Sequence, residues 1–273
     1  MIFDFWQSAI VIIPDKLSIS TERQCLLNVS VVIPVYNEES TLMDVVRKVC
    51  MEVPGLKEVV LVDDCSSDRS PEIIEKLKLS DPRIHCIRQE KNMGKTAALR
   101  AGFAVTSGDV VIIQDADAEY DPAEIRHVIQ PIMDGQADVV YGSRFLVRRA
   151  ARVVYFYHYL ANKFLTFLSN SLTNLNMTDV ETCYKAFRGS IIRNMVIESS
   201  GFGFEVEVTA KISKLHCRVY EVPISYYGRT YDEGKKIGFS DGVAAIFYIL
   251  YYNIFINLNG SFHPVPAGFP APK

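Results

Sequence analysis

Short runs of apolar, mostly β-branched residues recur along the first half of the chain and predict buried strands. The predicted strands cover residues 29–34, 58–63, 84–88, 110–113 and 138–141. Stretches with helical periodicity lie between them, at about 40–52, 70–79, 94–106 and 122–134. This alternation is typical of βαβ units, so the pattern predicts an α/β fold with a mostly parallel sheet and helices on both faces.

The pattern changes after the fifth predicted strand. A basic stretch at 144–152 is expected to be a loop, and residues 153–175 are predicted to form a helix rich in Tyr, Phe and Leu. A further strand is predicted at 218–224, followed by a loop at 228–236 that carries glycine and lysine. From Asn259 onwards the chain is rich in proline, and we expect this tail to lack fixed structure.

Composition narrows the possible classes of protein. The chain has 273 residues, is 49% hydrophobic and carries a net charge of -3, so it can bury a large core and has no overall basic field for nucleic acid. Anion binding must therefore be local. The six cysteines form no CxxC pair, which indicates reduced thiols in a cytosolic protein and argues against a disulfide framework or a zinc site.

Two apolar segments raise the question of a membrane. Residues 1–15 contain Asp4 and have neither a basic start nor a small-residue cleavage site, which argues against a signal peptide. Residues 242–262 are uncharged and almost long enough to span a bilayer, but they contain several asparagines and tyrosines. Such a helix could lie in the membrane interface or dock on the protein's own core. We expect no transmembrane helix.

Acidic residues follow the fourth predicted strand in close succession. Asp115 and Asp117 come directly after it, and Glu119 and Asp121 follow. The carboxyl ends of strands in open α/β sheets are where ligands bind, and clustered carboxylates suit a hard cation. A helix cap explains Asp121, since Pro122 begins the next helix, but it does not explain Asp115.

Two other predicted strands end in a comparable way. The first ends in Pro34, with Tyr36 and Glu38 behind it, and the second ends at Asp63. A tyrosine and a carboxylate at this edge could hold a base and a ribose, although a simple helix start is an alternative for these residues. Three acidic strand ends in one sheet are hard to explain by capping alone.

A Gly-Lys-Thr sequence at 94–96 resembles the end of a phosphate-binding P-loop. That loop needs a glycine where this chain has Gln89, so we do not expect a P-loop nucleotidase. At a helix N-terminus, Lys95 could still meet a phosphate or an acid from a neighbouring strand end.

Taken in order, these motifs resemble the inverting family 2 glycosyltransferases of the GT-A fold. The matching stretches are PVYNEE at 34–39, VDDCSSD at 62–68, NMGK at 92–95, QDADAEYDP at 114–122 and YGSRF at 141–145. The continuation at 178–185 and 221–236 is similar to the polyprenyl-phosphate sugar transferases of the dolichol-phosphate mannosyltransferase family. The resemblance covers about residues 29–245.

The resemblance implies a division of the chain. Residues 1–27 would be an N-terminal extension and 28–245 a GT-A domain. Within that domain, 28–142 would form the nucleotide-binding half and 143–245 an acceptor half with a helical region. Residues 246–273 would hold the end of the last helix and the proline-rich tail.

The resemblance also implies a donor site. Pro34, Tyr36, Glu38 and Asp63 match positions that hold the base and ribose, and Lys95 joins them near the phosphates. A divalent-metal cluster for Mg²⁺ or Mn²⁺ is formed by Asp115, Asp117 and Glu119, where relatives often have Gln at the last position.

Basic residues are implied for the phosphates. Positions that hold the acceptor phosphate are matched by Arg144 and by one of Arg148, Arg149 or Arg152. Asp179 is assigned to the same acceptor-phosphate site. A solvated or lipid-facing patch is the alternative for the residues of the basic stretch. Arg229 and Lys235 match a late loop that closes over the donor phosphates. Relatives have Ser-Gly-Phe-Arg where this chain has Thr-Cys-Tyr-Lys at 182–185, so the acceptor contacts there are expected to differ.

The implied activity is a metal-dependent, inverting transfer of a hexose from a GDP- or UDP-sugar to polyprenyl (dolichyl or undecaprenyl) phosphate. Asp115, Asp117 and Arg229 would be catalytic. The protein would be cytoplasmic and peripheral at the cytoplasmic face of the membrane. Two alternatives remain open: a soluble enzyme acting on a sugar hydroxyl, with Asp115 or Asp179 as the base, and a catalytically degenerate nucleotide-sugar-binding subunit.

Overall fold

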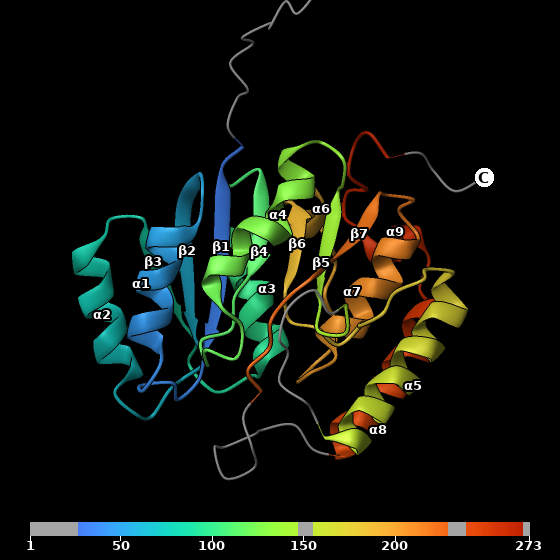
Figure 1. Cartoon of the computed structure of the whole chain (residues 1–273), viewed down its shortest axis with the longest axis horizontal. Coiled ribbons are helices and arrows are strands. Elements are labelled where there is room, and N and C mark those ends of the chain that lie inside the picture. The colour runs from blue at the N-terminus through green and yellow to red at the C-terminus, as the bar shows by residue number, and fades with distance from the viewer. Residues whose placement is uncertain (1–26, 147–154, 229–238, 270–273) are drawn as a thin grey trace, which may run out of the picture.

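The computed structural model describes residues 27–146, 155–228 and 239–269, which form a central sheet flanked by helices (Figure 1). Within these residues the sheet has seven strands in the order β3-β2-β1-β4-β6-β5-β7. Their bounds are β1 Val29–Val35, β2 Leu56–Asp63, β3 Ile84–Arg88, β4 Val110–Ile113, β5 Val139–Ser143, β6 Lys185–Arg188 and β7 Val219–Pro223.

The sheet is mostly parallel, as predicted. β1 pairs in parallel with β2 and β4, β2 with β3, and β5 with β7, whereas β6 runs antiparallel between β4 and β5. The sequence did not predict β6, because only Ala186 and Phe187 within it are apolar. This strand belongs to the predicted acceptor half but lies between β4 and β5, two strands of the predicted nucleotide half, so the two halves share one sheet.

The helices cover both faces of the sheet. The described elements are α1 Leu42–Glu52, α2 Ser70–Ser80, α3 Lys95–Val105, the 3-10 helix η1 Pro122–Glu124, α4 Ile125–Met133, α5 Phe156–Thr173, α6 Gly189–Asn194, α7 Phe204–Ser213, α8 Phe239–Ile254 and α9 Leu258–Ser261. Side chains of α1, α2 and α4 share one core with one face of the sheet, and those of α3, α6 and α7 share a second core with the other. The helices α6 and α7 were not predicted.

Helix α3 lies very close to the strands beneath it. A Cβ added to Gly102 would come within 2.5 Å of Val32 Cγ1 and 3.1 Å of Val62 Cγ2. Only glycine allows this approach, which fixes α3 and therefore Lys95 at its N-terminus against β1 and β2.

Helices α5 and α8 lie side by side beyond the β7 edge of the sheet (Figure 1). They share a small apolar cluster with α7, in which Leu165, Val206 and Ile249 are buried. In the described part of the chain, no helix is both long and apolar enough to cross a bilayer.

The prediction that the chain lacks fixed structure from Asn259 onwards is wrong for residues up to 269. Phe262 is only 1% exposed and belongs to the second core. The backbone N–H of His263 donates to the carbonyl of Asn194, and that of Val196 donates to Ser261. Burial of one large aromatic side chain outweighs the prolines that dominate the local composition.

Candidate active site

The ends of β1 and β2 meet at one edge of the sheet, because the strands are parallel neighbours. Glu38 is 7% exposed and Asp63 1% exposed, and Pro34 and Tyr36 lie on the same segment as Glu38. One carboxylate oxygen of Asp63 accepts the Ser66 N–H at 2.9 Å, while the other is 3.4 Å from Arg88 Nε. A buried, ordered carboxylate at a strand end is suited to a ribose or a base amide.

The neighbouring acid, Asp64, orders the loop before α3. Its two oxygens accept the backbone N–H groups of Met93 and Gly94, each at 2.8 Å. Gly94 has a φ of 86°, which a side chain would disfavour. The second acid of the Asp63-Asp64 pair thereby positions the N-terminus of α3, a role that the sequence analysis did not assign.

Lys95 lies at the centre of a buried polar cluster. Its Nζ is 2.9 Å from Asp115 Oδ1, 2.8 Å from Cys183 Sγ and 3.5 Å from Glu205 Oε1. Burial alone would lower the pKa of Lys95, but Asp115, Cys183 and Glu205 raise it well above its usual value. Lys95 is therefore a fixed cation, and it meets the acid of a neighbouring strand end as the sequence predicted.

Asp115, Asp117 and Glu119, the acidic triplet after β4, concentrate negative charge. Burial, followed by the charges of Asp115 and Glu119, raises the pKa of Asp117 to about 7. Glu119 accepts the Tyr226 hydroxyl at 2.7 Å. Asp121 does not join the triplet: it accepts the Ala123 N–H at 3.1 Å and caps η1, as predicted.

The triplet fits a hard divalent cation in its chemistry. Carboxylate oxygens are the ligands that Mg²⁺ and Mn²⁺ prefer, and a cation would offset the repulsion that raises the pKa of Asp117. Among the described residues, no three acidic, histidine or cysteine side chains are already arranged around one metal position.

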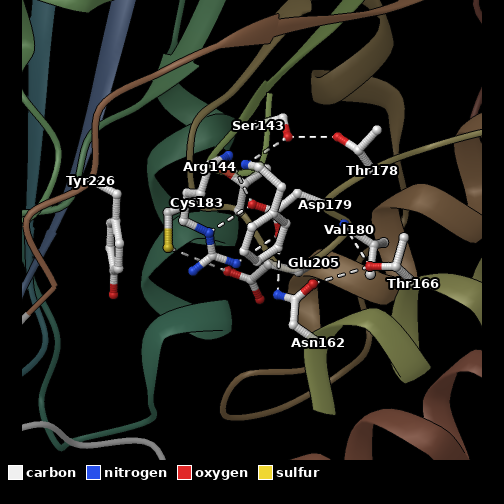
Figure 2. A network of polar contacts seen from close by, with 12 residues as sticks. Ser143, Arg144, Asn162, Thr166, Thr178, Asp179, Val180, Cys183, Glu205 and Tyr226 are labelled. Carbon is white, nitrogen blue, oxygen red and sulfur yellow. Dashed lines mark hydrogen bonds and ion pairs between the residues drawn. The ribbon is translucent and has the colours of Figure 1, made fainter. Parts of the chain in front are cut away.

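On the other side of Cys183, Arg144 forms a buried ion pair with Asp179. Asp179 accepts from the backbone N, Nε and Nη2 of Arg144 at 3.1, 2.7 and 2.8 Å, and from Asn162 of α5 at 3.2 Å (Figure 2). Burial alone would raise the pKa of Asp179, but Arg144 holds it below its usual range. The guanidinium also lies 5.1 Å from the Tyr226 ring centroid.

Residues 182–185, where this chain departs from the family that it resembles, connect the Lys95 cluster with the Arg144–Asp179 pair. Cys183 contacts Lys95, and the buried Lys185 ammonium donates to the carbonyls of Val180 and Thr182. Asp179 lies three residues before this segment, so residues 179–185 link the acceptor side of the predicted site to the donor side.

Three predicted site residues, Arg148, Arg229 and Lys235, lie outside the described residues, as do Arg149 and Arg152. Sequence reasoning missed Asp64, Asn162, Glu181, Glu205 and Tyr226. For Glu205 a signal existed, because acids at 205 and 207 interrupt an apolar helical stretch.

Comparisons with known proteins identify relatives of this chain. The chain is 29% identical over 231 residues to the undecaprenyl-phosphate mannosyltransferase of Micrococcus luteus, covering 81% of this chain and 92% of that protein. It is 30% identical over 215 residues to the dolichol-phosphate mannosyltransferase of Pyrococcus furiosus, covering 78% of this chain but only 60% of that protein. The shared part therefore leaves two fifths of the Pyrococcus protein unmatched.

Solved structures show the same fold. The glucosyl-3-phosphoglycerate synthase of Mycobacterium tuberculosis, in complex with Mn²⁺, UDP and phosphoglyceric acid, has a TM-score of 0.62 at 18% identity. The likeness covers 84% of this chain and 79% of that one. It confirms the predicted GT-A arrangement.

The family model described as Glycosyl transferase family 2 matches residues 30–196, which is more than half of the chain. This stretch contains the ends of β1, β2 and β4, Lys95 and the Arg144–Asp179 pair. The chain belongs to glycosyl transferase family 2.

Proposed function

We propose that this protein transfers a hexose from a GDP- or UDP-sugar to a polyprenyl phosphate, with inversion at the anomeric carbon. The observation that carries the proposal is the adjacency of two charged groups. A lysine–acid cluster at the end of β4 lies next to a buried arginine, and Cys183 and Asp179 on one segment connect them. The names of the relatives in Micrococcus and Pyrococcus support a polyprenyl-phosphate acceptor.

The donor would occupy the edge formed by β1, β2 and β4. Tyr36, Glu38 and Asp63 would hold the base and ribose, and Lys95 would face the diphosphate. Asp115, Asp117 and Glu119 would hold Mg²⁺ or Mn²⁺, which when bound stabilises the charge of the leaving diphosphate. Arg229 and Lys235 are proposed to approach the same phosphates.

The acceptor phosphate would meet Arg144. The Nε–H and one N–H of Nη2 are donated to Asp179, so Nη1 and the second N–H of Nη2 would face a ligand. Arg148 is proposed to add a second positive charge. A lipid phosphate is an anion near neutral pH and needs no strong base to attack the sugar.

The ion pair between Arg144 and Asp179 argues against a hydroxyl acceptor for which Asp179 would be the base. Arg144 keeps the pKa of Asp179 low and occupies both of its oxygens, so this carboxylate is a poor proton acceptor.

The lipid would approach along α5 and α8, which lie side by side and expose large apolar side chains. These are Phe156, Tyr157, Leu160, Phe164, Phe167, Val243, Phe247, Leu250 and Ile254, and the exposed Phe255 follows directly after α8. Asn162 and Lys163 of α5 bond to Asp179 and to the Thr178 carbonyl, which ties this surface to the acceptor side of the site. We therefore propose peripheral attachment at the cytoplasmic membrane face through these two helices.

The test is incubation of the protein with radiolabelled GDP- or UDP-hexose, Mn²⁺ and undecaprenyl or dolichyl phosphate. Label that moves into the organic phase and is released by mild acid marks the glycolipid product. Label transferred only to water-soluble sugars would replace this proposal with the hydroxyl-acceptor alternative. Donor binding without any transfer would identify a nucleotide-sugar-binding subunit.

A further inference from the structure

A buried carboxylate, that of Glu205, has no role in the donor and acceptor contacts assigned above. It is the second residue of α7 and is 4% exposed. Its Oε1 is 3.5 Å from Lys95 Nζ and 3.9 Å from Cys183 Sγ, while its Oε2 is buried and accepts no hydrogen bond from any described residue. A buried carboxylate oxygen without a donor is costly unless a ligand supplies one.

A second acid with a buried oxygen is Glu181, which lies on the chain between Asp179 and Cys183. Burial, followed by the charge of Glu205, raises the pKa of Glu181 to about 7, so the two carboxyl groups are close enough to influence each other. Glu181 Oε1 also lacks a hydrogen-bond partner among the described residues. Two buried oxygens, one from α7 and one from the turn before β6, are therefore left for a ligand with hydroxyl groups.

The position of Glu205 matches that of the transferred group. On one side, Lys95 links it to Asp115 at the donor end, where the diphosphate would lie. On the other side, Cys183 joins it to the segment that carries Asp179, whose partner is Arg144 (Figure 2). In an inverting transfer, the sugar lies between the leaving diphosphate and the attacking phosphate, and Glu205 lies between the groups proposed for each.

We infer that Glu205 binds hydroxyl groups of the donor's sugar and so contributes to the choice of sugar, with Glu181 as a second hydroxyl partner. This inference rests on the proposed function. A carboxylate accepts two hydroxyl hydrogen bonds at once, and a site built for a hydroxyl strongly disfavours an analogue that lacks it. No bond forms or breaks at Glu205 in this role.

A competing role is purely positional: Glu205 could serve only to hold Lys95. The two roles differ in what they predict for the nucleoside diphosphate alone. If Glu205 only positions Lys95, its loss weakens the binding of the sugar nucleotide and of the free diphosphate equally, since Lys95 faces the phosphates. If Glu205 binds the sugar, only the sugar nucleotide is affected.

The experiment compares wild type with Glu205→Gln by calorimetric titration of the full-length protein, using GDP-mannose, UDP-glucose, GDP and UDP, each with Mn²⁺. For the sugar nucleotide that the wild type binds, we expect about tenfold or greater weakening, with the free diphosphate within about twofold of wild type. Equal weakening of both ligands, or of neither, would overturn the inference.

Two further variants keep the test decisive. Glu205→Asp keeps the negative charge on a side chain that is one methylene shorter. It should cause a smaller loss of affinity, again confined to the sugar nucleotide. Glu207→Gln alters a buried acid of the same helix that caps the backbone at 198–199, and it should lower thermal stability without separating the two ligands. If the wild type binds both ligands but transfers no sugar, the proposed function fails while the Glu205 comparison still stands.

Discussion

Arg144 and Asp179 form a bidentate ion pair inside the site, with Nε 2.7 Å from Oδ2 and Nη2 2.8 Å from Oδ1. Asp179 is completely buried, so removing the arginine would leave a carboxylate without its main partner. We expect Arg144→Ala to lower the free energy of unfolding by about 3 kcal/mol, as for other broken buried pairs. Urea denaturation monitored by circular dichroism measures this change.

The double variant Arg144→Ala/Asp179→Asn is the matched control. It removes both charges, so it should be more stable than Arg144→Ala alone. Both variants should lose transfer to polyprenyl phosphate. Stability of the double variant equal to or below that of the single variant would mean that Asp179 is not held by its charge.

Asp117 provides a test of metal dependence. Asp117→Asn keeps the side-chain shape but removes a charged ligand, so we expect turnover to fall by at least about a hundredfold. The assay is sugar transfer across a Mn²⁺ and Mg²⁺ concentration series. Glu119→Gln keeps an oxygen ligand and should retain much more activity. Near-normal turnover in Asp117→Asn at low metal would contradict the proposed ligand set.

The raised pKa of Asp117 also predicts how metal binding and stability depend on pH. Protons compete with metal for this carboxylate below about pH 7, so the rise in Tm on adding Mn²⁺ should be larger at pH 8 than at pH 6.

Without metal, the folded protein binds more protons than the unfolded chain between pH 3.8 and about 7, so the Asp117 contribution to stability falls as pH rises through this window. Asp117→Asn should reduce both effects, and scanning calorimetry at several pH values measures them.

The sequence predicts the parallel part of the fold because β1, β2, β4 and β5 contain apolar runs, and several of the helices between the strands have start signals. It fails at β6, whose four residues include Lys185 and Arg188 and carry no such run. It also places the acids at strand ends, since parallel strands bring their carboxyl ends together. Glu205 and Asn162 could not be placed, because their proximity to the site depends on how α7 and α5 pack against the sheet.

Gly102 predicts a packing effect away from the charged groups. A methyl group there would clash with Val32, so Gly102→Ala should destabilise the protein by about 1–3 kcal/mol despite the better helix propensity of alanine. Gly242→Ala in α8 is the matched control, since its added Cβ meets no atom within 4 Å. That variant should be neutral or slightly stabilising. Equal effects in the two variants, measured by thermal denaturation, would show that α3 can shift outwards at little cost.

The exposed face of α5 and α8 predicts the route to the lipid. Phe167 and Phe247 are 69% and 62% exposed, and a folded protein gains nothing in water from such side chains. The double variant Phe167→Glu/Phe247→Glu should reduce binding to anionic lipid vesicles by about tenfold or more, because charges replace side chains that would enter the interface. Vesicle co-sedimentation measures this binding.

Leu79→Glu serves as the control for this face, since Leu79 is 89% exposed on α2, at the far end of the sheet. It should bind vesicles like the wild type. The double variant should keep its activity on a short-chain, water-soluble polyprenyl phosphate, because neither phenylalanine belongs to the charged site, and lose it on long-chain acceptor in vesicles. Equal loss on both acceptors would mean that the two side chains support the fold, and vesicle binding unchanged from wild type would place membrane attachment elsewhere on the protein.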